Sequence, residues 1–132
     1  KDGTIDAICS DHTPVDDDEK LLPFGEASPG ATGLELLLSL ALKWADEDLS
    51  GNDKLSMALA RITCDAARVA GLSAGGLSVD SQADVCIFDP EIRWQVNASA
   101  IVSQGKHTPF LGYELPGQVR YTIVSGRLAY TR

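Results

Sequence analysis

The first half of the chain opens with an apolar run and continues into a long helical pattern. Residues 5–9 show no alternation of apolar and polar positions, which is typical of a strand buried on both faces. A polar loop follows, and residues 32–45 then carry leucines on nearly every side, which predicts a helix packed between a sheet and other helices. Thr32 and Glu35, three positions apart, match a capping box, so we expect the helix to begin there.

Two shorter helices are predicted after this one. The second helix should begin near Ser56, whose hydroxyl makes it a good N-cap. Asp65 is expected to cap a further short helix over residues 66–70, which Gly71 ends at the C′ position. Together with the preceding strand, these helices indicate an α/β organisation for residues 1–71.

The pattern changes after Gly71. Residues 72–82 are small and polar, as in a linker. A strand is predicted over residues 85–88, where Asp89-Pro90 stops it, and a second strand over residues 92–96.

The C-terminal end predicts a β-hairpin. Residues 119–124 and 128–131 are strand-like and flank Ser125-Gly126, a pair suited to a tight turn. Residues 72–132 therefore form a β-rich part that is distinct in pattern from residues 1–71.

Composition narrows the class of protein. A net charge of -8 argues against nucleic acid or an anionic membrane as a partner. No apolar run approaches the roughly 20 residues of a membrane span. The cysteines are scattered and lack metal-site or disulfide spacing, which predicts reduced thiols and a cytoplasmic location; they are Cys9, Cys64 and Cys86.

The best candidate chemistry lies directly after the predicted strand, at Asp11 and His12. Polar side chains released at the carboxyl end of a buried strand are where α/β barrels keep their active sites. An aspartate in this position can equally cap the following turn. The acidic run at residues 16–19 lacks the alternating ligand spacing of a calcium loop, so we expect a solvated face there.

Many short motifs in one order resemble those of dihydroorotases, within the amidohydrolase superfamily. They cover nearly the whole chain: Asp11-His12-Thr13-Pro14, Glu19-Lys20, Phe24, Ala27, Gly30, Gly33-Leu34-Glu35, Ala66-Ala67-Arg68, Gly71-Leu72, Ala83-Asp84, Phe88-Asp89-Pro90, Thr108-Pro109-Phe110 and Gly112. The resemblance implies the C-terminal third of a larger protein. Residues 1–71 would be the last strand, loop and helices of a (β/α)8 metal-dependent hydrolase barrel, and residues 72–132 part of its small β-sandwich.

The resemblance also assigns roles to single residues. Asp11 matches the family's catalytic aspartate, which binds zinc and carries the proton of the attacking water. Ala27 and Gly30 match positions of the substrate-binding loop, which contacts substrate through its backbone. Val15 stands where the family commonly has a histidine that holds the substrate carboxylate. For His12 a packing or hydrogen-bonding role is expected.

Two functions follow from the resemblance. One is zinc-dependent hydrolysis of a cyclic amide, between carbamoyl aspartate and dihydroorotate in pyrimidine biosynthesis, or a related allantoinase or hydantoinase activity. The other is a non-catalytic subunit that scaffolds aspartate carbamoyltransferase, which Val15 favours. We expect the chain alone to be inactive and free of zinc, because it lacks most ligands of the family's site, and to associate with the rest of the barrel and with further copies. His107 is expected to make a turn hydrogen bond and no chemistry.

Overall fold

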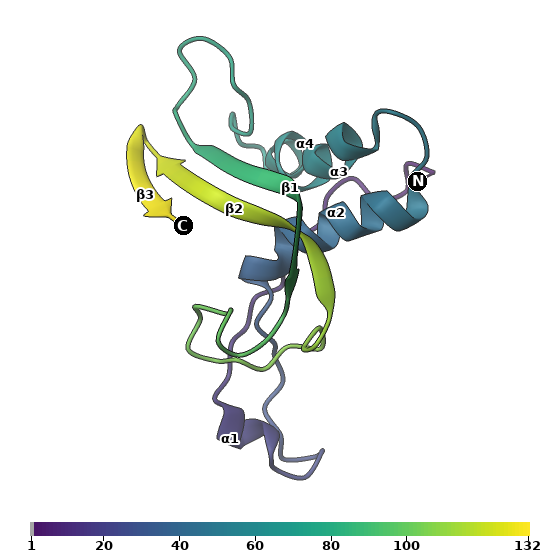
Figure 1. The fold of residues 1–132 in the computed structure, drawn as a ribbon, viewed down its shortest axis with the longest axis vertical. Coiled ribbons are helices and arrows are strands. Elements are labelled where there is room, and N and C mark those ends of the chain that lie inside the picture. Colours follow the sequence, from purple (N-terminus) through teal and green to yellow (C-terminus); the bar gives the residue numbers. More distant parts are fainter. Residues whose placement is uncertain (1) are drawn as a thin grey trace.

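The computed structural model describes residues 2–132, which form a helical layer beside a three-stranded antiparallel sheet of order β1-β2-β3 (Figure 1). The helices are α1 (Asp17–Lys20), the 3-10 helix η1 (Leu34–Leu36), α2 (Leu37–Asp48), α3 (Lys54–Ile62) and α4 (Cys64–Val69). The strands are β1 (Val85–Gln95), β2 (Glu114–Val124) and β3 (Arg127–Thr131). Within these residues, no helix is long and apolar enough to cross a membrane.

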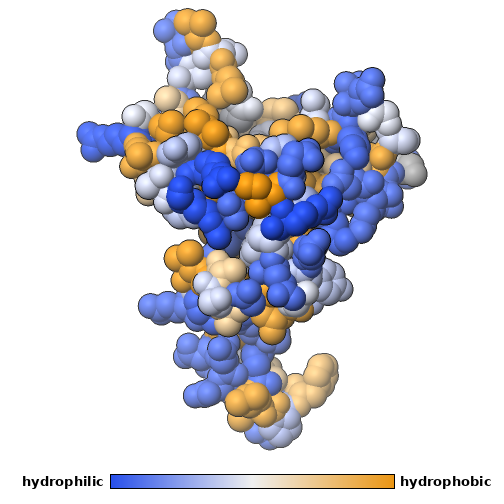
Figure 2. All heavy atoms as spheres, in the orientation of Figure 1, coloured by the Kyte–Doolittle hydropathy of each residue, from blue (hydrophilic) through white to orange (hydrophobic). Residues whose placement is uncertain are grey.

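The segment that carries α1 projects away from both layers (Figure 1). Apolar side chains gather near its end, where Leu21 and Phe24 are exposed to solvent (Figure 2). The acidic side chains of α1 are also exposed, as expected for residues 16–19.

Residues 5–9 do not form the predicted strand. The Ile8 N–H donates to the Arg61 carbonyl at 3.0 Å, a single link to the end of α3, and Ile5 is 66% exposed. A strand of a parallel barrel takes its hydrogen bonds from the strands on either side. Residues 2–132 supply no such neighbours, so this apolar run is extended without a ladder.

The helix predicted over residues 32–45 begins later and has two parts. Leu34–Leu36 form one 3-10 turn, and the α-helix continues over Leu37–Asp48. Its buried side lies against β2, and Gly117 permits the close approach because a Cβ there would stand 2.4 Å from Leu42 Cδ1. The glycine also holds a φ of 87°, which a side chain would disfavour.

The predicted capping box does not form. The Thr32 hydroxyl donates to the Gly105 carbonyl at 2.6 Å instead of capping its own helix. The Glu35 carboxylate accepts from the amides of Val102 and Ser103, at 2.7 and 2.8 Å. Both side chains therefore bond to backbone groups about 70 residues away and not to the first turn of their own helix.

The next two helices agree with the prediction in number but not in their starts. α3 begins at Lys54, two residues before Ser56. Asp65 lies in the first turn of α4 and does not cap it; its buried carboxylate pairs with Arg61 and Arg68. Gly71 does end α4, with a φ of 69°. Its N–H donates to the Arg68 carbonyl, and the Leu72 N–H donates to the Ala67 carbonyl, which is a Schellman motif.

The two strands predicted over residues 85–88 and 92–96 are one strand, β1. Its pairing with β2 continues across the expected break, with Asp89 opposite Gln118 and Arg93 opposite Pro116. Four steps along β1 thus match two along β2, so Pro90 lies in a bulge where no ladder N–H is needed. The predicted hairpin is confirmed: Ser125 and Gly126 have φ values of 50° and 76°, as a type I′ turn requires.

One core cluster joins the two parts of the chain. It contains Leu36 from the helical layer together with Val96, Ile101 and Leu115. Beside it, the Trp94 indole N–H lies 3.1 Å from Ser39 Oγ and 2.9 Å from the Gly117 carbonyl oxygen. The division into residues 1–71 and 72–132 stays a prediction, but the helical layer is packed against the sheet.

Candidate functional site

Asp11 lies in an unusual backbone conformation at the end of the apolar run. Its φ is 45°, in the left-handed region, which aspartate adopts more readily than most residues but still at a cost. The residue is exposed, and within residues 2–132 its carboxylate has no hydrogen-bond or salt-bridge partner. It therefore does not cap the following turn, and the carboxylate is open to a ligand.

The turn at Asp11 is held by close packing of two backbones. The Thr13 N–H donates to the Ala31 carbonyl at 3.0 Å. A Cβ on Gly30 would stand 2.4 Å from the Thr13 carbonyl oxygen, and one on Gly33 would stand 2.7 Å from the Ser10 carbonyl oxygen. Glycine is required at both positions because the segments before and after Asp11 run against this loop.

His12 connects the same turn to the start of the helix. Its Nδ1 accepts hydrogen bonds from the backbone amides of Gly33 and Leu34, each at 3.2 Å. These amides precede the first intrahelical bonds, so they need partners from outside the helix. The expected hydrogen-bonding role of His12 is confirmed.

A third segment, residues 101–108, supports the loop from its other side. Besides the bonds of Thr32 and Glu35 to this segment, the Thr32 N–H donates to the His107 carbonyl at 2.8 Å. The backbone of His107, not its imidazole, makes the turn contact. Burial raises the pKa of Glu35, but the hydrogen bonds from the Val102 and Ser103 amides and the Lys106 charge outweigh it and hold that pKa below 4.5.

Val15 lines a cavity of about 320 Å³ at the edge of this region. A Cβ on Gly105 would stand 2.6 Å from the Val15 carbonyl oxygen, so this backbone too is closely packed. The cavity is also lined by Asp16 and Glu19, and none of its described lining residues carries a positive charge. The lining thus offers no positively charged side chain to the carboxylate that the family's histidine would hold.

Ala27 and Gly30 differ in what their backbones leave free. The Ala27 N–H donates to the Pro23 carbonyl at 2.9 Å within a local turn, so this donor is already bonded. Within residues 2–132, the Gly30 N–H and the Ala27 carbonyl have no partner. The Ala27 carbonyl and the Gly30 amide are thus available to bind a ligand.

No complete metal site is assembled by the described residues. Residues 2–132 bring together no group of three His, Cys, Asp or Glu side chains that could hold an ion. The Asp11 carboxylate fits one oxygen position of a zinc site.

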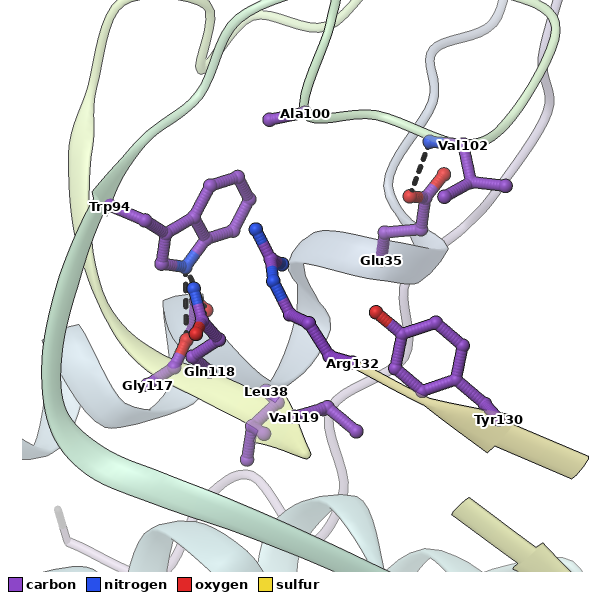
Figure 3. Close-up of a pocket in the computed structure, with 11 residues that line it drawn as sticks. Glu35, Leu38, Trp94, Ala100, Val102, Gly117, Gln118, Val119, Tyr130 and Arg132 are labelled. Carbon is purple, nitrogen blue, oxygen red and sulfur yellow. Dashed lines mark hydrogen bonds between the residues drawn. The ribbon is translucent and has the colours of Figure 1, made fainter. Parts of the chain in front are cut away.

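A second cavity, of about 310 Å³, lies between α2 and the sheet (Figure 3), and Asp11 is not among its lining residues. Trp94 and Arg132 point toward one another in it, and Glu35 and Tyr130 lie near its other side (Figure 3). Sequence reasoning missed this cavity because its lining comes from residues scattered between positions 35 and 132, with no local motif.

Comparison with known proteins places the chain in a family. Residues 1–130 match the model of the Amidohydrolase family. The chain is 42% identical over 132 residues to the dihydroorotase of Geobacter metallireducens, covering 100% of this chain and 30% of that protein. It is 40% identical over 130 residues to a dihydroorotase-like protein of Pseudomonas putida, covering 98% of this chain and 30% of that protein.

The fold is similar to that of solved hydantoinases. The D-hydantoinase (dihydropyrimidinase) from Thermus sp. aligns with a TM-score of 0.83 at 24% identity, over 96% of this chain and 28% of that chain. The chain thus spans about 30% of the length of the curated relatives it matches. On this evidence the chain is dihydroorotase-like and belongs to the amidohydrolase family.

Proposed function

We propose that the chain is the C-terminal part of a (β/α)8 barrel and its small β-sandwich, in a protein that hydrolyses a cyclic amide of the dihydroorotate type. The observation that carries this proposal is the exposed Asp11 carboxylate, free of partners within residues 2–132, on a backbone turn that Gly30 and Gly33 hold in place. A strained, well-supported turn at a single acid is typical of a functional site. The dihydroorotase of Geobacter metallireducens, at 42% identity, supports the same activity.

In the reaction, Asp11 accepts a proton from the attacking water as the water oxygen bonds to the ring carbonyl carbon. Asp11 then returns that proton to the ring nitrogen as the carbon–nitrogen bond breaks. Zinc, when bound, lowers the pKa of a water molecule and polarises the carbonyl. Asp11 would be one of its ligands, and a complete site needs further ligands from outside residues 2–132. The free Gly30 amide is suited to orient a substrate oxygen.

The test is Asp11→Asn in the full-length polypeptide. Loss of the proton carrier should reduce hydrolysis of dihydroorotate by about 10²–10⁴-fold. The matched control is Asp18→Asn, an exposed acid of α1 outside the site, which should leave the rate unchanged. Equal rates for wild type and Asp11→Asn, with both proteins folded, would refute the proposal.

A second candidate is a non-catalytic subunit that holds aspartate carbamoyltransferase in an assembly with further copies of itself. Val15 and the acidic cavity beside it favour this candidate, because an anionic substrate meets two carboxylates and no positively charged side chain there. Co-purification of the full-length protein with aspartate carbamoyltransferase, together with the absence of dihydroorotate turnover, would support it over the enzyme.

A further inference from the structure

His12 makes two hydrogen bonds to a segment that is distant in the sequence. Its Nδ1 lies 3.2 Å from the Gly33 nitrogen and 3.2 Å from the Leu34 nitrogen, across 21 and 22 positions of the chain. Nδ1 is the acceptor in both contacts, and a ring nitrogen that accepts a hydrogen bond carries no hydrogen of its own. The two bonds therefore fix both the orientation of the ring and its tautomer.

The helix has no other side-chain cap among the described residues. Gly33, at the N-cap position, has no side chain, and neither Thr32 nor Glu35 bonds to the first turn, since both are bound to the 101–108 segment. The imidazole of His12 therefore does for η1 and α2 what an N-cap serine or aspartate usually does from within the helix.

The bonds of His12 bear directly on the neighbouring residue. The Ser10 carbonyl packs on Gly33, and the His12 ring binds the amide of that same glycine. The residues before and after Asp11 are therefore both in contact with Gly33. With both flanks held, the backbone of Asp11 keeps a φ of 45°. If the His12 bonds are removed, the residues after Asp11 are held only by the Thr13–Ala31 bond and the packing of Thr13 on Gly30. The inference is that this weaker support lets the Asp11 backbone relax and turn its carboxylate.

We propose that His12 is a positioning residue for Asp11 and acts through the hydrogen-bond acceptor at Nδ1. The inference rests on the proposed function in one respect, namely that the direction of the Asp11 carboxylate matters for proton transfer. The acceptor position, not the size or polarity of the side chain, is the property that His12 supplies.

Two amide variants of the full-length polypeptide separate these properties. In His12→Asn, the Oδ1 atom stands at the same number of bonds from the backbone as Nδ1 and can accept from both amides. In His12→Gln, the polar atoms stand one bond farther out, where Nε2 was, and the δ-position acceptor is lost. His12→Ala removes the polar atoms at both positions. Melting temperatures show which variants are folded.

The first measurement is hydrogen–deuterium exchange of the Gly33 and Leu34 amides. We expect exchange to rise at least tenfold in His12→Gln and to stay within threefold of wild type in His12→Asn. Exchange does not require turnover, so it decides the inference even in a protein without activity. Equal exchange in the Asn and Gln variants would overturn the proposal.

The second measurement is steady-state hydrolysis of dihydroorotate, with bound zinc determined in parallel. We expect His12→Gln to lower kcat at least tenfold with KM within threefold and zinc retained, because a misplaced carboxylate slows the reaction without weakening substrate binding. His12→Asn should restore kcat to within threefold. If Asp11→Asn loses turnover but His12→Gln keeps an unchanged kcat, the positioning role of His12 is refuted and the proposed function is not. If Asp11→Asn keeps its turnover, the proposed function is refuted instead.

Discussion

The Glu35 carboxylate accepts a hydrogen bond from the amide of Val102 at 2.7 Å and so ties the first turn of the helical layer to a segment 67 positions away. Glu35→Gln should destabilise the full-length protein by about 1–2 kcal/mol, because hydrogen bonds to a charged, half-buried acceptor are replaced by weaker ones. Urea unfolding measures the change. The control is Glu26→Gln, an exposed acid that makes no side-chain bond within residues 2–132, and a loss equal to that of Glu35→Gln would contradict the assignment.

The same carboxyl group predicts a dependence of stability on pH. The pKa of Glu35 in the folded protein lies below its ordinary value of 4.5. The charged form therefore stabilises the fold fully above about pH 4.5, and this contribution is lost as the pH falls through the lower, folded pKa. Unfolding of wild type and Glu35→Gln at about pH 6 and about pH 3 should show a difference that shrinks on acidification. A difference that grows would contradict the sign.

Gly33→Ala is expected to disturb the turn at Asp11. The added Cβ would stand 2.7 Å from the Ser10 carbonyl oxygen, and a backbone atom cannot move aside as a flexible side chain can. We expect a loss of about 1–3 kcal/mol in the free energy of unfolding, as for overpacked sites, together with slower dihydroorotate hydrolysis. Gly25→Ala is the matched control, since a Cβ there meets nothing within 4 Å; equal effects at the two glycines would count against the close approach.

Val15→His distinguishes the two candidate functions. In an active enzyme the histidine supplies a charge-assisted hydrogen bond to the substrate carboxylate, worth about 1.5–3 kcal/mol. The KM for dihydroorotate should then fall by about ten- to a hundredfold. Val15→Leu, which adds no donor, should leave KM unchanged. If neither wild type nor Val15→His turns over dihydroorotate, that result counts against a dihydroorotase and favours the non-catalytic subunit.

The features that sequence predicted correctly are those with local causes. The turn at Ser125-Gly126 and the helix end at Gly71 depend on positive φ at a glycine and on neighbours within a few residues. Thr32 and Glu35 also matched a local motif, but both side chains bond to backbone groups of the 101–108 segment instead. No spacing rule connects residues so far apart, so their pairing could not be derived from the chain alone.

The sequence proposed residues for the candidate site but not the contacts that hold them. Asp11 and His12 were singled out by their place after the predicted strand and Gly30 by resemblance, and the structure brings the segments that carry them together. The Nδ1 contacts of His12 depend on a loop returning after 21 residues, which no periodicity encodes. Residues 5–9 failed as a strand for a related reason: a ladder depends on neighbouring strands, and apolar character alone does not supply them.

The bonds from the 101–108 segment to Thr32 and Glu35 also decide where related sequences can be recombined. A crossover at the exposed linker near residue 72 would separate residues 10–35 from the backbone that supports them. Parental sequences that differ in the length of the 101–108 segment would then form a chimera whose turn at Asp11 has lost its support. The site is therefore inherited as a discontinuous unit, in which residues 10–35 and 101–108 have to come from the same parent.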